Sequence, residues 1–344
     1  MDRKKLALSM AAFGLALAGC DSAETFMFPA RNPSCPAGQS PPCSTEAGEM
    51  LTAEQPSTYM ETPVSRTYVV SVIEVPAVAE GDTASPGFNV DGLNSGADTS
   101  GAPADATCEE IAADFVNSVE PEHVGVDNAL GGLVPTLEET GMIDIGAALA
   151  EQIETGSLLL ALRVTDINDF TFDESVQLEL FLTEVPGGGM PMVDGSGLLA
   201  PDQEFAVTQN LGPAVDGDIY AGRLRAQTES LTITVDTEDF TLPLEISEAQ
   251  VRFDISETGI SEGQIGGFIR VEDVIAAVAD IMPGFESTAL GIVQLVADVE
   301  PCADGVTCPG AYDDEGNVTE TIEDNPTVCA SVSVGLTFEG VSAS

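Results

Sequence analysis

Acidic side chains supply most of the chemistry that this sequence offers, and two short segments concentrate them in a pattern that suits a hard cation. The ligand candidates are Asp166, Asp169 and Asp173 in the first segment and Asp313, Asp314 and Asn317 in the second. Calcium binds oxygen ligands from carboxylates, amides and backbone carbonyls, and both segments are rich in these groups. Neither segment has the spacing of the EF-hand loop. Calcium at these loops is therefore the one cofactor that the sequence suggests, and we expect no other.

The sequence offers no set of residues that resembles a catalytic site. His123 is the only histidine and lies in a polar stretch, where a lone imidazole is most often a solvated side chain. General-base catalysis would need a nucleophile within hydrogen-bond reach of it, and the chain has no G-x-S-x-G elbow. Carboxylates are so frequent that choosing two as the acid and base of a hydrolase would be arbitrary. We therefore expect no catalytic residue and a protein that is not an enzyme.

Seven cysteines are present, and one of them, Cys20, is set apart by its position near the amino terminus. The others, an even number, are Cys35, Cys43, Cys108, Cys302, Cys308 and Cys329. Zinc is the alternative to disulfides for clustered cysteines, but no C-x₂-C spacing occurs and only one histidine is available. Short loops favour the pairs Cys35–Cys43 and Cys302–Cys308, which leaves Cys108 for Cys329. The sequence by itself leaves the connectivity open.

The first twenty residues have the features of an export signal. Asp2–Lys5 carries positive charge, and Leu6–Ala16 is apolar but shorter than the roughly 20 residues that a membrane-spanning helix needs. Leu17–Cys20, with the sequence LAGC, resembles the lipobox of bacterial lipoproteins. This resemblance implies that the Cys20 thiol receives a diacylglyceryl group, that the signal peptide (residues 1–19) is removed, and that lipid anchors the protein to a membrane. Asp21 does not decide between the inner and the outer membrane.

The charge of the chain is extreme and excludes several partners. The formal net charge is −48. Removal of residues 1–19 takes away both lysines and leaves seven arginines against 57 acidic residues. No basic patch remains to bind phosphates, so we expect no nucleic-acid partner and no electrostatic attachment to anionic lipid. A hydrophobic fraction of 43% and a mean hydropathy of +0.14 indicate a sizeable folded core rather than general disorder.

The hydrophobic pattern predicts an α+β fold dominated by antiparallel strands, as a sandwich or a partial barrel. We expect a flexible tether over residues 20–60 and a globular domain over 61–344, with a loop or disordered insert at 76–107. Alternating apolar residues predict strands, which we place at 64–75, 158–165, 176–183, 217–226, 231–235, 242–246, 251–255, 264–271 and 328–338. Helical spacing predicts helices at 108–119, 145–156, 272–282 and 287–297, whereas glycine and proline interrupt the apolar run after Asp127.

These features favour a non-enzymatic, lipid-anchored, exported protein of the cell envelope, with a structural, adhesive or interaction role. The body of the chain is similar to uncharacterised acidic envelope lipoproteins of Gram-negative bacteria, a resemblance that implies no particular activity. The alternative is a binding module for an apolar or lipid-like ligand, lined by residues 129–153 and Ile265–Phe268. A hydrolase that uses carboxylates is a third hypothesis. The sequence leaves open the partner (the membrane apart), the oligomeric state, and whether the protein faces the periplasm or the cell surface.

Overall fold

The computed structural model describes residues 60–344, apart from 61, 80, 92–113, 140–144, 196–197, 237–240, 282–283, 303–304 and 314–316. The predicted signal peptide and residues 20–59 of the predicted tether lie outside the described residues. In the described part of the chain, no helix is both long enough and apolar enough to cross a membrane.

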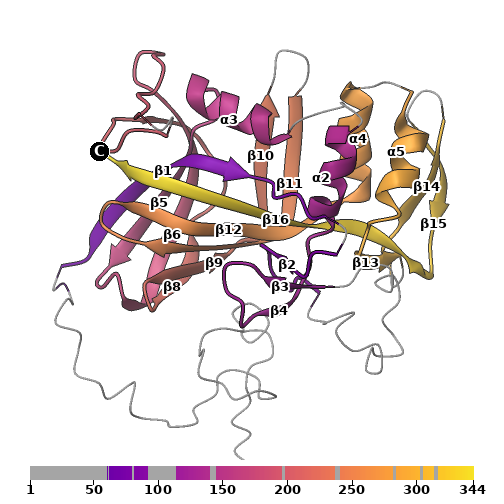
Figure 1. Ribbon diagram of the computed structural model, residues 1–344, viewed down its shortest axis with the longest axis horizontal. Helices are drawn as coiled ribbons and strands as arrows, with labels where there is room; N and C mark the ends of the chain where they lie inside the picture. Colours follow the sequence, from indigo (N-terminus) through magenta and orange to yellow (C-terminus); the bar gives the residue numbers. More distant parts are fainter. Residues whose placement is uncertain are drawn as a thin grey trace, which may run out of the picture. The chain divides into compact units, whose positions relative to one another are not determined.

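Eight antiparallel strands close into a barrel, because strand β16 pairs with β12 on one side and with the first strand, β1, on the other (Figure 1). In order around the barrel they are β1 (Val64–Glu74), β5 (Leu160–Ile167), β6 (Phe172–Glu184), β8 (Val215–Tyr220), β9 (Arg223–Gln227), β11 (Thr241–Ile255), β12 (Gly259–Arg270) and β16 (Asn325–Ala343). The predicted β-dominated α+β fold is confirmed, and the barrel is closed, whereas the prediction was a sandwich or a partial barrel.

The remaining elements extend or cover this barrel. Three strands extend it: β7 (Ala206–Asn210) pairs with β6, β10 (Ser230–Asp236) with β11, and β13 (Val299–Cys302) with β16. Two small sheets are separate: β14 (Cys308–Tyr312) with β15 (Val318–Ile322), and β2 (Ala84–Ser85) with β3 (Phe115–Asn117) and β4 (Val124–Val126). The helices among the described residues are α2 (Ala129–Glu139), α3 (Ile145–Thr155), α4 (Val271–Ile281) and α5 (Glu286–Val293).

Apolar residues alternate with polar ones along the strands, and the apolar side chains point inward and fill the interior of the barrel. Phe253 on β11 meets Phe338 on β16 edge to face, with ring centroids 5.9 Å apart, although β12 lies between these strands. Tyr68 on β1 reaches across to donate a hydrogen bond to the carbonyl oxygen of Ser256 at 2.6 Å. Leu162 is fully buried in the same core. Since successive strand residues point to opposite faces, the neighbours of these residues form the outer wall.

The helices pack on this core. Leu149 and Ile153 of α3 are buried, as the spacing of the predicted helix requires. α2 forms in a stretch where the sequence suggested interruption by glycine and proline. Gly131 explains this, because a Cβ there would lie 2.8 Å from the Val78 side chain and 2.9 Å from the carbonyl oxygen of Pro76. Glycine is therefore needed at this position for close packing, and it does not end the helix.

Three sequence predictions of local structure were wrong. Phe115–Asn117, within the predicted helix 108–119, forms strand β3. The predicted strand 217–226 is a hairpin of β8 and β9, since Ala221 and Gly222 turn the chain with φ angles of 53° and 86°. The two strands predicted at 242–246 and 251–255 form one strand, β11, in which Glu248 adopts a φ of 47° at a break in register.

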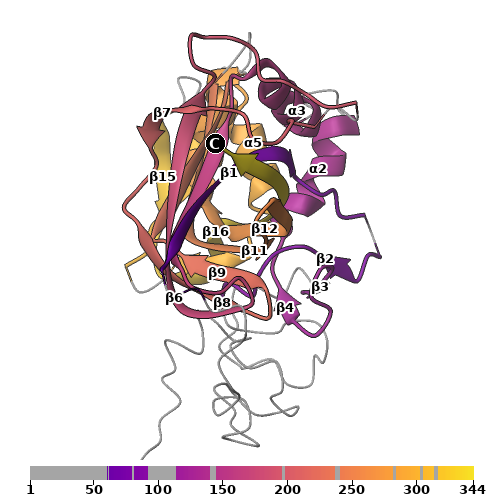
Figure 2. The same ribbon diagram turned by 90° about the vertical axis from the view of Figure 1, so that its left-hand side faces the viewer.

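A covering segment, defined here as residues 81–91 and 114–128, lies against the outside of the barrel and carries β2, β3 and β4 (Figures 1 and 2). Part of it falls in the predicted loop or insert at 76–107, and its residues 85–88 are buried. Phe88 packs with Phe268 of β12, and a Cβ on Gly266 would lie 2.4 Å from the Phe88 ring. This close fit places the segment on the wall formed by β9, β11, β12 and β16.

Candidate functional site

The barrel wall beneath the covering segment carries a row of polar residues. Asp218 on β8, Arg225 on β9, Arg252 on β11 and Gln264 on β12 are direct cross-strand neighbours in that order. Arg252 lies between the interior residues Val251 and Phe253, so its side chain points to the outer face. Yet it is only 3% exposed, because the covering segment encloses it.

Arginine is concentrated at this place in a chain that has very few cations. Arg223, Arg225 and Arg252 are three of the eight arginines in the whole sequence, and all three lie on the adjacent strands β9 and β11. Arg223 and Arg225 are separated by one residue on β9, and Arg252 on β11 lies directly opposite Arg225, so the three guanidinium groups lie on one face of the sheet. Such a group of cations recognises carboxylates and other anions well.

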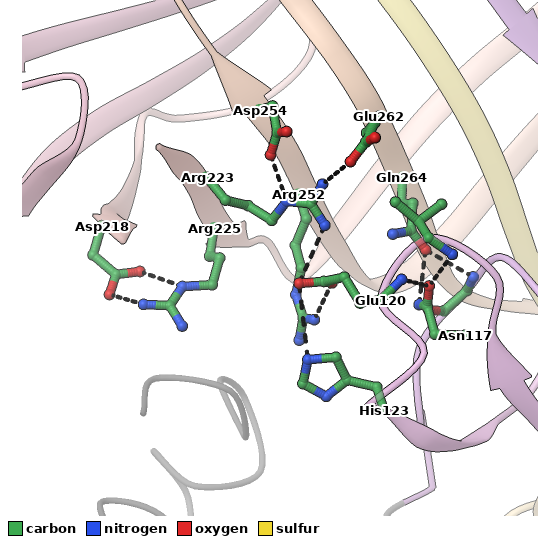
Figure 3. A network of polar contacts seen from close by, with 12 residues as sticks. Asn117, Glu120, His123, Asp218, Arg223, Arg225, Arg252, Asp254, Glu262 and Gln264 are labelled. Carbon is green, nitrogen blue, oxygen red and sulfur yellow. Dashed lines mark hydrogen bonds and ion pairs between the residues drawn. The ribbon is translucent and has the colours of Figure 1, made fainter. Parts of the chain in front are cut away.

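Glu120 of the covering segment joins two of these arginines (Figure 3). Its Oε2 accepts a hydrogen bond from Arg252 Nη1 at 2.8 Å, and its Oε1 lies 3.2 Å from Arg223 Nη1. Arg223 also donates to Asp254 at 2.7 Å and to Glu262 at 2.8 Å. The Glu120 side chain is 13% exposed, so its contacts with the two arginines are largely shielded from water. We call Glu120, Arg223, Arg252 and Gln264 the arginine cluster.

Arg225 belongs to the same wall but has a partner of its own. Its Nε and Nη2 donate to the two carboxylate oxygens of Asp218 at 3.2 and 2.6 Å, and its guanidinium lies 5.5 Å from the centre of the Tyr220 ring. A two-point contact with a carboxylate and stacking on an aromatic ring both fix the orientation of a guanidinium. Arg225 therefore supports the wall beside the arginine cluster and is not part of it.

The electrostatics of Glu120 favour its charged form. Burial by itself raises the pKa of this carboxyl group, but the charges of Arg252 and Arg223 and the hydrogen bond from Arg252 outweigh it, so the pKa lies below its usual value. Arg252 has a lowered pKa because of burial, which Glu120 opposes. Each member of the pair thus compensates for the burial of the other.

His123 lies at the edge of the arginine cluster, which differs from the solvated loop residue expected from the sequence. Its Nε2 is 3.8 Å from Glu120 Oε1, and its side chain is 20% exposed. Burial and the charge of Arg252 lower its pKa, against the opposing effect of Glu120. His123 is therefore neutral at neutral pH.

A metal ion is a poor fit to the carboxylates beside His123. Glu120, Glu122 and His123 can bring one ligand atom each within 4.8 Å of one another. However, Glu120 already faces Arg223 and Arg252, and a dication there would be repelled by both guanidinium groups. The two guanidinium groups that face Glu120 favour an anionic group at this position instead.

The segments predicted to bind calcium are held by hydrogen bonds within their own loops. Asp169 Oδ1 accepts from the backbone N–H of Thr171 at 2.6 Å, and Asp173 Oδ2 accepts from that of Asn168 at 2.6 Å. Asp166 adopts a φ of 62° in the same turn. In the second loop Asp313 Oδ1 accepts from the N–H of Asn317 at 2.8 Å, and Asp314 lies outside the described residues. These contacts stabilise turns without requiring a metal, and calcium stays a prediction.

One predicted disulfide is confirmed. Cys302 and Cys308 are bonded, with Cα atoms 5.8 Å apart, and both are buried. Cys329 is also disulfide-bonded. Cys35, Cys43 and Cys108 lie outside the described residues, as does Cys20, so the other two predicted pairs and the lipidated cysteine stay predictions.

Two hollows in the described part of the chain have very different linings. The first has a volume of about 10 Å³ between β1, α3, β5 and β10, and its walls are apolar. The second has a volume of about 350 Å³ and lies near the Cys302–Cys308 disulfide, lined by Arg270, Glu272, Glu300, Gly305, Val306, Thr307, Pro309 and Ala330. Of the residues predicted to line an apolar binding site, Ile265 is fully buried and Gly266 lies beneath Phe88.

The arginine cluster was missed by sequence reasoning, although a signal for it exists. Arg-Leu-Arg at 223–225 and Val-Arg-Phe at 251–253 place charges within apolar strands, in a chain where cations are rare. Charged residues are seldom buried without a partner, so these positions require carboxylates nearby.

Comparisons of the chain with protein-family models, with curated proteins and with solved structures found no match.

Proposed function

We propose that this chain is a lipid-anchored, exported protein of the cell envelope whose barrel serves as a non-enzymatic interaction domain. The anchor rests on the LAGC sequence that ends at Cys20 and on the charged and apolar residues before it. Acyl chains on that cysteine would hold the protein at a membrane surface, since each buried CH₂ contributes about 0.8 kcal/mol.

The filled interior of the barrel is the observation that favours an interaction domain over a binder of apolar ligands. Tyr68, Phe253 and Phe338 occupy the space that a ligand would need, and the apolar hollow between β1, α3, β5 and β10 has a volume of about 10 Å³. Pockets for small molecules commonly measure about 300–1,000 Å³. The filled interior therefore supports recognition through the outer surface of the domain.

The anchor is tested by intact-mass analysis of the native protein purified from membranes. The expected mature terminus is Cys20 with the added mass of a diacylglyceryl group, and a Cys20→Ala variant should retain its leader and lack that mass. An unmodified terminus at another position would refute the anchor.

The non-enzymatic role is tested by complementation in cells from which the gene has been deleted. His123→Gln should restore any deletion phenotype fully, because no catalytic step depends on the imidazole, whereas Cys20→Ala should fail to restore it. Loss of complementation by His123→Gln, at an unchanged protein level, would favour an enzyme.

A further inference from the structure

The covering segment is attached to the barrel wall through side chains. The backbone N–H of Gly87 and the Asn117 amide both donate to Gln264 Oε1, at 3.2 and 2.9 Å. Asn128 Oδ1 accepts from the N–H of Gly335 at 3.0 Å. Because β2, β3 and β4 form a sheet of their own, these contacts can be exchanged without unpairing a barrel strand.

Glu120 makes the charged contact of this attachment, and Arg252 depends on it. Among the described residues, Glu120 is the one carboxylate within ion-pair distance of Arg252, whose guanidinium otherwise lies 4.8 Å from the centre of the Phe88 ring. Glu120 presents one oxygen to each of two arginines, which is the arrangement that a free carboxylate would adopt between them.

Gln264 supplies an unused hydrogen-bond donor beside this pair. Its side chain is fully buried, and its Nε2 has no hydrogen-bond partner among the described residues, although its Oε1 accepts two hydrogen bonds. Gln264 lies directly opposite Arg252 on the neighbouring strand, and Figure 3 shows its amide nitrogen on the side that faces the arginines. A buried donor without an acceptor is costly, so a ligand oxygen here would be stabilising.

We propose that Arg223, Arg252 and Gln264 form a binding site for a carboxylate ligand, and that Glu120 occupies this site until a ligand displaces it. The atoms that would face such a ligand, Nη1 of Arg223, Nη1 of Arg252 and Nε2 of Gln264, are all N–H donors, and an ionised carboxylate offers only acceptors. The inference goes beyond the proposed interaction domain and does not depend on the lipid anchor, because none of its residues belongs to the predicted tether or leader.

The net charge of the protein restricts the ligand. The acidic protein repels an approaching anion over a distance of about a Debye length, and this repulsion grows with the charge of the anion. A ligand with a single carboxylate is therefore repelled least. A free organic acid and one carboxylate of an acidic peptide share this chemistry. Both would have to compete with Glu120, which is tethered beside the arginines at a high effective concentration.

The test uses the full-length chain and sodium acetate as the probe. In the Glu120→Ala variant the competitor is gone, so acetate should raise the melting temperature and bind at least tenfold more tightly than to the parent chain. Sodium chloride and sodium sulfate at equal ionic strength should not reproduce the rise. The matched control is Glu120→Ala combined with Arg252→Met, in which the acetate effect should disappear.

Three outcomes would overturn the carboxylate site. They are an equal response to acetate and chloride, an acetate effect that persists in the double variant, and equal acetate affinity in the parent and Glu120→Ala chains. Should Glu120→Ala fail to fold, Glu120→Gln keeps the side-chain volume without the charge and is measured in the same way. A short polyglutamate peptide distinguishes a free organic acid from the carboxylate of an acidic peptide. If the peptide binds more tightly per carboxylate than free glutamate does, the ligand is a peptide.

Discussion

Glu120 and Arg252 form an ion pair at 2.8 Å although 132 residues separate them in the chain. The pair joins the covering segment to β11, and both side chains are largely buried. Removing one partner from a buried pair leaves the other charge desolvated and uncompensated, which is more costly than the pair itself is stabilising. The attachment of the covering segment should therefore be sensitive to either residue.

Arg252→Met should lower the free energy of unfolding by about 3 kcal/mol, because Glu120 would lose its shortest ion pair and keep the longer contact with Arg223. Urea unfolding measures this loss. The matched control is Arg270→Met, since Arg270 pairs with Glu272 at 3.5 Å while both side chains are more than half exposed. That pair should contribute less than about 1 kcal/mol. Equal losses in the two variants would contradict the importance assigned to the Glu120–Arg252 pair.

Gly335→Ala should loosen the covering segment. A Cβ at Gly335 would lie 2.2 Å from the carbonyl oxygen of Pro86, which is backbone and cannot move alone, so we expect a loss of about 1–3 kcal/mol. Hydrogen exchange at residues 81–91 and 114–128 should accelerate more than exchange in the barrel strands. The control is Gly291→Ala in α5. A Cβ at this position would have no neighbour within 4 Å among the described residues outside its own helix, and alanine favours a helix. Protection of the covering segment that stays unchanged in Gly335→Ala would refute this packing.

The strands of the barrel were readable in the sequence because alternation is a local property. Val176, Leu178 and Leu180 alternate with polar residues, and all three are buried on one face of β6. Closure of the barrel could not be predicted from the sequence in this way. It depends on pairing between β1 and β16, whose partners include Val69 and Val341, and no local pattern specifies a contact over so long a separation.

The arginine cluster eluded prediction for a related reason. Glu120 is one acidic residue among 58, and nothing in its neighbours marks it as the one that meets Arg252. The sequence identified His123 as a residue of interest but placed it in solvent, whereas the fold places it against Glu120. Strand register decides these neighbours, and a shift of one residue would turn Arg252 into the core.

Calcium should leave the thermal stability unchanged. Asp169 and Asp173 already accept backbone N–H groups in the first loop, and Asp313 binds Asn317 in the second. Adding calcium or a chelator at fixed ionic strength should therefore give the same melting temperature. A rise with calcium that magnesium does not reproduce, and that Asp173→Asn removes, would instead establish the first loop as a calcium site.

Stability should fall as the pH rises from about 4 to above 7, in part because of Asp298. Burial, with a smaller contribution from the charge of Asp91, raises its pKa to about 7 against the hydrogen bonds from Ser333. Between the ordinary pKa of an aspartate and this raised value, the unfolded chain has released the proton that the folded chain still holds. The unfolded state therefore binds fewer protons, and the free energy of unfolding decreases with pH over that window.

Asp298→Asn should reduce this pH dependence while keeping the local structure. The amide oxygen can still accept the hydrogen bond that Ser333 N–H donates to Asp298 at 2.8 Å, and its NH₂ group can donate to the serine hydroxyl. The variant should gain stability relative to the parent at pH 8 and lose that advantage at pH 4. Urea unfolding at both pH values measures the difference, with the same change at the exposed Asp324 as the control. An advantage of Asp298→Asn that is equal at pH 4 and pH 8 would show that the carboxyl group of Asp298 does not titrate between the two states.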